Sequence, residues 1–252
     1  MDSQETSPRD LMPTAIQRAR AYAVHVYTAS GVALAFLAAA EICHPTPDVR
    51  LVFIFLFVAV AIDATDGVLA RRWRVKVWAD RVDGRTIDDI VDYLTYTFVP
   101  LLLMWRMEWL PSPAALWILP AMIASLFGFA NSQAKDEAGG FFLGFPSYWN
   151  VVAFYAGLFG GPAVAPTTGV ITLTLALLTI LPVRFLYPNL TPAPWRVPVL
   201  AGALVWMGML IALLASYPHG PRWLLWSSLL YPVFYTLLSL HLHREQTRTA
   251  SA

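Results

Sequence analysis

Runs of about twenty apolar residues recur along the chain, and short polar or proline-rich breaks separate them. A helix needs about 20 predominantly apolar residues to cross a bilayer. Eight segments meet this length approximately: 22–42, 50–71, 85–105, 113–134, 141–160, 166–187, 197–216 and 222–241. The breaks contain turn-forming residues, as in HPTPD, EWLPSP and YPHGP. The pattern therefore predicts an all-α polytopic membrane protein with eight transmembrane helices.

Proline lies inside three of the segments, at Pro120, Pro182 and Pro232, and we expect each one to kink its helix. Residues 1–21 are polar and end in the amphipathic stretch LMPTAIQRARAY, which we expect to lie along the membrane surface as an interfacial helix after a cytoplasmic tail. Residues 242–252 form a second tail. The chain is thus predicted to be a single membrane domain, 1–252, whose transmembrane bundle spans 22–241.

The bulk composition agrees with a membrane protein. Of 252 residues, 58% are hydrophobic and 13% are charged, with a mean hydropathy of +0.57. Soluble domains carry about 25% charged residues. The net charge of +1 provides no basic field for nucleic acid, so a nucleic-acid partner is not expected.

The distribution of basic residues predicts the orientation in the membrane. If the N-terminus is cytoplasmic, all but Arg50, Arg106 and Arg222 of the 17 Lys and Arg residues belong to cytoplasmic segments or helix ends. This asymmetry follows the positive-inside rule. Both termini are therefore predicted to be cytoplasmic.

Four aspartates lie inside two neighbouring predicted helices. Asp63 and Asp66 are three residues apart, and Asp88 and Asp92 are four apart, so each pair is expected to share one face of its helix. A carboxylate at the centre of a membrane helix costs about 2.5–3.5 kcal/mol. In an antiparallel hairpin these positions place Asp63 opposite Asp92 and Asp66 opposite Asp88. Four crowded anions need cations, and oxygen-only ligands suit Mn²⁺ or Mg²⁺. The sequence predicts a divalent metal site facing the cytoplasm.

The aspartates form part of a longer pattern: Asp63-x2-Asp66-Gly67-x2-Ala70-Arg71, twelve residues, then Gly84-x3-Asp88-x3-Asp92. This pattern resembles the signature of the CDP-alcohol phosphotransferases, integral membrane enzymes that join a CDP-activated donor to an alcohol. All eight signature residues are present in order. The resemblance implies a six-helix family core, here with two further helices, and a homodimer.

The gap between Arg71 and Gly84 is longer than the eight residues common in that family. A gap of twelve resembles the bacterial phosphatidylcholine synthases, which condense CDP-diacylglycerol with free choline. Eight predicted helices and the segment GFPSYWNVVAFY also fit that branch. The resemblance therefore implies transfer of a phosphatidyl group from CDP-diacylglycerol to choline, in a bacterial inner membrane.

The resemblance implies a role for each signature residue. Asp63, Asp66 and Asp88 would hold two divalent ions on the donor diphosphate, and Asp92 would complete that site and act as general base. The donor-binding residues would be Gly67, Ala70, Arg71, Gly84 and Lys135. Within this set, Gly84 is expected to let the third helix approach the second closely.

Choline carries a quaternary ammonium group, which proteins hold against aromatic faces and a carboxylate. The candidates near the cytoplasmic side are Tyr93, Tyr96, Phe145, Tyr148, Trp149 and Tyr155. We name Tyr148 and Trp149 as the choline contacts.

Several alternatives stay open at this point. Another acceptor would make the protein a phosphatidylserine or phosphatidylglycerophosphate synthase. Intramembrane acids also occur in cation-coupled transporters. Asp89 is expected to serve as a helix-start charge or ion-pair partner, and the turn 72–83 as a solvated basic loop. His25 and Thr28 are candidates for nucleotide contact or helix packing.

Overall fold

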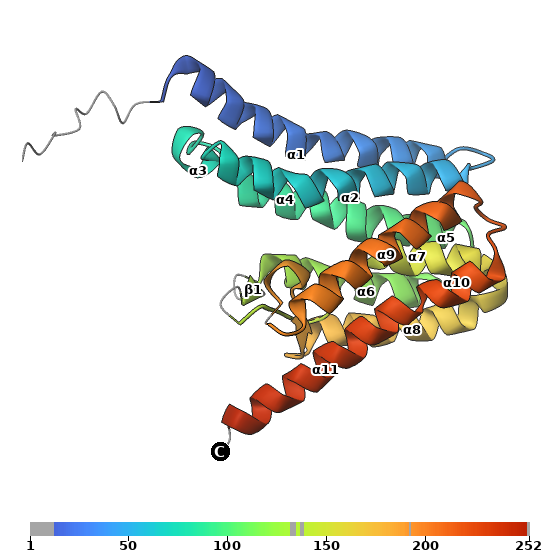
Figure 1. Ribbon diagram of the computed structural model, residues 1–252. Helices are drawn as coiled ribbons and strands as arrows, with labels where there is room; N and C mark the ends of the chain where they lie inside the picture. Colours follow the sequence, from blue (N-terminus) through green and yellow to red (C-terminus); the bar gives the residue numbers. More distant parts are fainter. Residues whose placement is uncertain (1–12, 132–134, 137–138, 192, 251–252) are drawn as a thin grey trace, which may run out of the picture.

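A computed structural model describes residues 13–131, 135–136, 139–191 and 193–250. The elements, in chain order, are α1 (Ala15–Ile42), α2 (Val49–Arg72), α3 (Val75–Trp78), α4 (Gly84–Asp92), the π-helix η2 (Tyr93–Phe98), α5 (Val99–Arg106), α6 (Ala115–Ala130), β1 (Lys135–Asp136), β2 (Phe141–Leu143), α7 (Trp149–Leu158), η3 (Gly161–Val164), α8 (Ala165–Ile180), β3 (Arg184–Leu186), η4 (Pro188–Leu190), α9 (Arg196–Ala215), α10 (Arg222–Ser228) and α11 (Leu230–Ala250). The helices run side by side as a bundle (Figure 1).

Among the described residues, five helical stretches are long and apolar enough to cross a membrane: Ala15–Ile42, Val49–Arg72, Gly161–Ile180, Arg196–Ala215 and Arg222–Glu245. Two shorter apolar helices, Ala115–Ala130 and Trp149–Leu158, lie among them. The remaining predicted segment is the continuous run α4–η2–α5, whose first turns carry the aspartates. The predicted polytopic helical membrane protein is confirmed, while the number of eight spans stays a prediction.

The first helix begins earlier than expected. Thr14 caps α1 at its N-terminus, with a reciprocal pair of hydrogen bonds to Gln17, and the helix then continues without a break to Ile42. Residues 15–22 of the stretch that we expected to form a separate interfacial helix are therefore the first part of α1. Residues 1–12 lie outside the described part of the chain.

Two predicted helices are shorter than the hydrophobic pattern suggested, because a strand occupies one end of each predicted segment. The segment 141–160 begins as β2, and its helix starts only at Trp149. The segment 166–187 ends as a helix at Ile180, where Leu181 turns to extended backbone (ψ 143°). A residue that precedes proline is disfavoured in the α conformation, so Pro182 ends this helix instead of kinking it.

The other two prolines have different effects. Pro120 lies inside α6, as expected. Pro232 is the third residue of α11, and α10 ends at Ser228, four residues earlier. Proline has no N–H for the carbonyl four residues before it, so the predicted single helix 222–241 is divided into two.

The sequence reading assigned no strand, but β1, β2 and β3 form a small antiparallel sheet in that order. Helix α11 closes the outer edge of β3 with side chains one turn apart. The Tyr235 hydroxyl donates to the carbonyl of Leu186 at 2.7 Å, and the Leu186 N–H donates to Ser239 Oγ at 3.1 Å. Side chains of α11 thereby satisfy backbone groups at the edge of the sheet. These bonds hold the sheet against the bundle next to the start of α7.

The largest buried cluster joins α1, α2, α5, α6, α7, α8, α9 and α10. Its aromatic centre places Phe53 against Phe154, with ring centroids 5.0 Å apart, and Phe53 against Tyr217 at 5.4 Å. A separate small cluster packs Val75 and Ala79, in and next to α3, against Ala21 and Val24 of α1. Helices α2 and α4 are both packed against α1, and this arrangement sets the position of the acidic residues.

Candidate active site

Three of the four predicted carboxylates come together between two helices. Asp63 projects from α2, and Asp88 and Asp92 project from α4. One ligand oxygen from each lies within 4.8 Å of the others, and all three residues are partly buried. Carboxylate oxygens are the ligands that Mg²⁺ and Mn²⁺ prefer, so this group is suited to a divalent ion. We refer to Asp63, Asp88 and Asp92 as the acidic triad.

Asp66 is not a member of the acidic triad. It is buried, with 8% of its surface exposed, and its Oδ2 accepts a hydrogen bond from the Thr28 hydroxyl of α1 at 2.8 Å. Residues three apart on a helix point about 60° away from each other, whereas residues four apart diverge by about 40°. Asp63 therefore lies with the aspartates of α4, while one oxygen of Asp66 is bonded to α1. Asp66 thus lies outside the acidic triad, and its predicted pairing with Asp88 stays a prediction.

Tyr96 is hydrogen-bonded to a member of the acidic triad. Its hydroxyl donates to Asp63 Oδ2 at 2.7 Å from the π-helix η2, immediately after α4. The sequence reading gave Tyr96 only as one of several aromatic candidates. The spacing of Asp88, Asp92 and Tyr96, at intervals of four, was the signal that could have distinguished it.

The two predicted choline contacts occupy different environments. Tyr148 precedes α7 and is half-buried, and its ring centroid lies 6.1 Å from that of Tyr96 and 6.3 Å from that of Phe145. Trp149 is fully buried, and its indole N–H donates to Ser125 Oγ at 2.7 Å. The structure therefore leaves Tyr148 beside the acidic triad and makes Trp149 a core residue that packs α7 against α6.

Of the signature residues in α2, Gly67 and Arg71 are one turn apart. A methyl group added at Gly67 would meet only Arg71 Nη1, at 3.6 Å, so the Arg71 side chain runs back along the helix beside the glycine. Ala70 packs partly against the small cluster around α3. Lys135 belongs to β1, and its side chain lies outside the described part of the structure.

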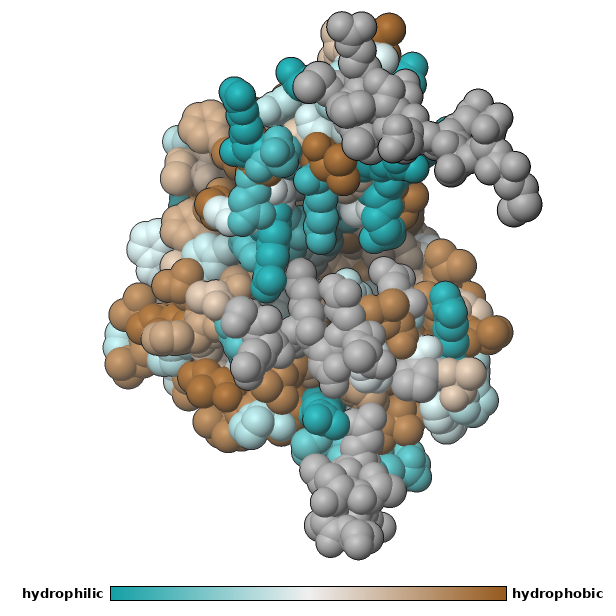
Figure 2. Space-filling model, turned by 90° about the vertical axis from the view of Figure 1, so that its left-hand side faces the viewer, coloured by the Kyte–Doolittle hydropathy of each residue, from teal (hydrophilic) through white to brown (hydrophobic). Residues whose placement is uncertain are grey.

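The turn between α2 and α4 is more ordered than a solvated loop. Val75 and Ala79 are buried, while Arg72, Arg74, Lys76 and Arg81 are exposed. Figure 2 looks onto this end of the molecule and shows hydrophilic side chains gathered around the ends of α1 to α4. The basic residues are thus solvent-facing, as expected, on a turn that is anchored by α3.

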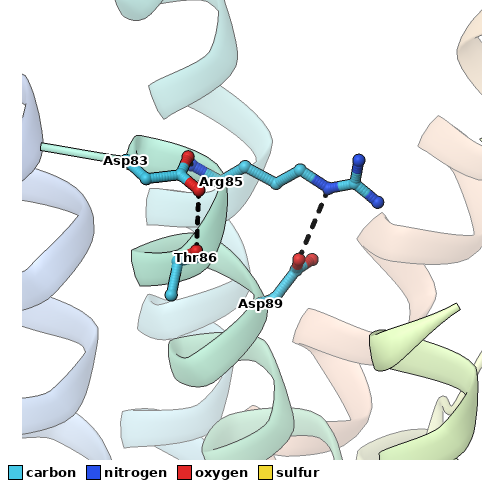
Figure 3. A network of polar contacts seen from close by, with 4 residues as sticks. All are labelled: Asp83, Arg85, Thr86 and Asp89. Carbon is cyan, nitrogen blue, oxygen red and sulfur yellow. Dashed lines mark hydrogen bonds and ion pairs between the residues drawn. The ribbon is translucent and has the colours of Figure 1, made fainter. Parts of the chain in front are cut away.

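Helix α4 starts with a cap that Figure 3 shows in detail. Asp83 accepts hydrogen bonds from the Thr86 hydroxyl at 2.8 Å and from the Arg85 N–H at 3.0 Å. The Thr86 hydroxyl, followed by the backbone N–H of Arg85, lowers the pKa of Asp83 because both donors favour the charged carboxylate. Asp89 forms an ion pair with Arg85, Nε to Oδ2 at 3.5 Å. This agrees with the structural role expected for Asp89.

Gly84 is in close contact with α1, not with α2 as the sequence reading expected. A methyl group added at Gly84 would lie 2.8 Å from Cε1 of His25. His25 is buried, with 7% of its surface exposed, and among the described residues its Nε2 has no hydrogen-bond partner. Gly84 therefore allows α4 to pack against the imidazole ring of His25 in α1. Of the two roles considered for His25, nucleotide contact or helix packing, the structure shows the packing contact.

We expect Gly84→Ala to destabilise the fold by about 1–3 kcal/mol, because the added methyl group overpacks a buried contact. The loss should appear as a lower thermal unfolding temperature in detergent. His25→Ala, combined with Gly84→Ala, should recover part of it. Gly208→Ala is the matched control, since a methyl group there would meet no atom within 4 Å. Equal effects of Gly84→Ala and Gly208→Ala would contradict the contact.

The fold and the site define a helical, multi-pass membrane protein with an acidic site between two of its helices. No model of a known protein family matches the chain. The chain is 38% identical over 185 residues to a phosphatidylcholine synthase of Pseudomonas aeruginosa, an alignment that covers 72% of this chain and 74% of that protein. It is 36% identical to the phosphatidylcholine synthase of Bradyrhizobium diazoefficiens (75% and 68% covered) and 32% identical to that of Legionella bozemanae (74% and 88% covered). The chain belongs to the phosphatidylcholine synthase family.

Proposed function

We propose that the chain is a phosphatidylcholine synthase that transfers the phosphatidyl group of CDP-diacylglycerol to the hydroxyl of choline and releases CMP. The relatives bear the name phosphatidylcholine synthase at identities up to 38%. The observation that carries the proposal at the level of residues is the acidic triad, because three carboxylates converge there from two helices of a membrane bundle.

The acidic triad fits Mn²⁺ or Mg²⁺, since its donor atoms are carboxylate oxygens within 4.8 Å of one another. We propose two ions held by Asp63, Asp88 and Asp92, with Asp66 as the fourth ligand. The hydrogen bond from Thr28 orients the Asp66 carboxylate, as partners of metal ligands commonly do. Bound ions would supply positive charge next to the donor diphosphate and the departing CMP.

Asp92 is proposed as the general base. The choline hydroxyl gives its proton to a carboxylate oxygen of Asp92 while its oxygen attacks the β-phosphorus of CDP-diacylglycerol. The new P–O bond to choline forms as the P–O bond to CMP breaks, and CMP leaves as the anion. The transfer is direct, so no side chain of the chain forms a covalent intermediate.

The donor is proposed to bind along the ends of α2 and α4 that carry Gly67, Ala70, Arg71 and Gly84, with Lys135 nearby. The planar guanidinium of Arg71 suits phosphate oxygens, and its position beside Gly67 supports this role. Tyr148 is proposed to contact the choline ammonium, because its ring lies 6.1 Å from the ring of Tyr96, whose hydroxyl is bonded to Asp63. Trp149 is withdrawn from the choline contacts because it is fully buried.

The proposal places the enzyme in a bacterial inner membrane as a single membrane domain, with eight spans, both termini cytoplasmic and the site open to the cytoplasm. The positive-inside pattern supports the orientation. The family resemblance supports a homodimer.

Release of CMP by the purified protein in lipid micelles tests the function. With CDP-diacylglycerol and Mn²⁺, we expect choline to support release at least about 100-fold faster than serine or glycerol 3-phosphate, since a cationic acceptor needs aromatic contacts and the others need hydrogen-bond donors. Faster release with serine or glycerol 3-phosphate would make the protein another CDP-alcohol phosphotransferase. No release with any of the three would favour a cation-coupled transporter.

A further inference from the structure

The helix that carries Asp88 and Asp92 changes its geometry immediately after the second aspartate. Residues Tyr93–Phe98 form the π-helix η2, between α4 and α5. π-Helical turns occur frequently at functional sites. In a regular α-helix each step of four residues advances the side chain by about 40° beyond a full turn, so Asp88, Asp92 and Tyr96 would drift around the helix. The wider π-turn contains more residues and reverses this drift, which keeps Tyr96 on the side of α2.

The hydroxyl of Tyr96 is bonded to a member of the acidic triad. It donates to Asp63 Oδ2 at 2.7 Å, across from η2 to α2. Hydrogen bonds to carboxylates are short and about twice as strong as neutral ones. Partners of this kind fix the orientation of metal-binding groups, and their removal commonly costs 10–100-fold in metal affinity or activity. Tyr96 therefore holds the Asp63 carboxylate in a defined orientation before any ligand binds.

The ring of Tyr96 faces a second aromatic group. Tyr148 lies 6.1 Å away at an interplanar angle of 54°, and Phe145 lies 6.3 Å from Tyr148 at 82°. The segment that carries both of these rings is held by backbone hydrogen bonds, Gly144 N–H to the Val183 carbonyl at 2.8 Å and Phe145 N–H to the Leu178 carbonyl at 3.0 Å. Three rings thus lie next to one another beside a cluster of carboxylates, which is the combination that binds quaternary ammonium groups.

We propose that Tyr96 links the two halves of the site: its hydroxyl positions Asp63 for the divalent ion, and its ring forms a wall of the choline pocket together with Tyr148. The role of the Tyr96 ring in the choline pocket, called here the ring half, rests on the proposed function. The role of the Tyr96 hydroxyl in positioning Asp63, called the hydroxyl half, rests only on the acidic triad. The two roles belong to different atoms of one side chain, so substitutions can separate them.

Three variants test the inference. Tyr96→Phe removes the hydroxyl and keeps the ring, and Tyr96→Leu removes both. Tyr93→Phe is the matched control, because Tyr93 belongs to the same π-helix but donates to the Met122 carbonyl at 3.3 Å and packs against Phe129 of α6. The first measurement is binding of Mn²⁺ to the protein without substrates, by electron paramagnetic resonance. The second is the KM for choline at saturating Mn²⁺ and CDP-diacylglycerol, together with kcat.

We expect Tyr96→Phe to weaken Mn²⁺ binding about 10-fold while the KM for choline at saturating Mn²⁺ stays within about twofold of wild type. Tyr96→Leu should weaken Mn²⁺ binding to the same degree and also raise the KM for choline about 10-fold. Tyr93→Phe should change neither value. Tyr148→Leu, a second ring variant, should raise the KM for choline and leave Mn²⁺ binding unchanged, so the ring half stays testable if Tyr96→Leu does not fold.

A different result would contradict each half of the inference. Unchanged Mn²⁺ binding in Tyr96→Phe would overturn the role of the hydroxyl. An unchanged KM for choline in both Tyr96→Leu and Tyr148→Leu would overturn the aromatic wall. Parallel losses of melting temperature and of every kinetic parameter in Tyr96→Phe would show a structural role alone. If the wild type does not use choline, the proposed function fails, but the Mn²⁺ comparison still decides the hydroxyl half.

Discussion

Asp92→Asn is expected to lower kcat by about 100- to 10,000-fold, the range that a positioned general base contributes. The amide is nearly the same size as the carboxylate but cannot accept the hydroxyl proton of choline. The measurement is CMP release at saturating CDP-diacylglycerol, choline and Mn²⁺. Donor binding, followed by retention of labelled CDP-diacylglycerol, should persist because Asp63 and Asp88 remain.

Asp89→Asn is the matched control for this substitution. Asp89 is three residues earlier on the same helix, and its ion pair with Arg85 is partly exposed. Such pairs contribute about 0–1 kcal/mol, so the variant should fold and turn over nearly as wild type. Comparable loss of activity in both variants, or loss of folding in Asp92→Asn, would show that Asp92 is a structural residue.

Removal of divalent ions is the second change with a large expected effect. Treatment with excess EDTA should lower CMP release to the background rate, because the acidic triad then holds mutually repelling carboxylates and nothing offsets the charge of the diphosphate. Added Mn²⁺ or Mg²⁺ should restore the rate. Zn²⁺ should restore it poorly, since zinc prefers nitrogen and sulfur ligands in a tetrahedral arrangement.

Binding of Mn²⁺ to the EDTA-treated protein provides an independent check of the same site. It should be lost in Asp63→Ala and retained in Asp89→Asn. Full activity in EDTA would contradict a metal-dependent transfer. Loss of activity that neither Mn²⁺ nor Mg²⁺ restores would indicate that EDTA unfolds the protein. A lower unfolding temperature after EDTA treatment would identify that outcome.

The helices that carry the site were predictable from the sequence to within a few residues. The predicted segment 50–71 is α2 (Val49–Arg72), and 85–105 is the continuous run from Gly84 to Arg106. The convergence of Asp63, Asp88 and Asp92 also followed from their spacing. These features are local: an apolar run long enough for the bilayer forms a helix, and an acidic residue within it needs a compensating partner.

The strands and the orientation of individual polar groups were not predictable in this way. Phe141–Leu143 is apolar, and two of the three residues of Arg184–Leu186 are apolar, so neither segment is distinguished from the helices around it. They form strands because they pair with each other and with Tyr235 and Ser239 of α11. A short apolar run cannot be distinguished as helix or strand from periodicity alone. The pairing partners lie tens of residues away in the sequence, so the local pattern cannot predict them.

Local patterns of residues were enough to predict a polytopic helical protein, the helices that carry the acidic residues, and the signature that indicates the family. Packing between helices sets three contacts that these patterns do not predict: Thr28 donates to Asp66, Gly84 lies against His25, and Tyr96 donates to Asp63. The physical reason is that helix formation depends on neighbours within a turn or two, whereas the direction of a side chain matters only once another helix is packed against it. Here the packing of α1 and the π-helical geometry of η2 set these side-chain directions. The spacing of the aspartates in the sequence predicts neither of them.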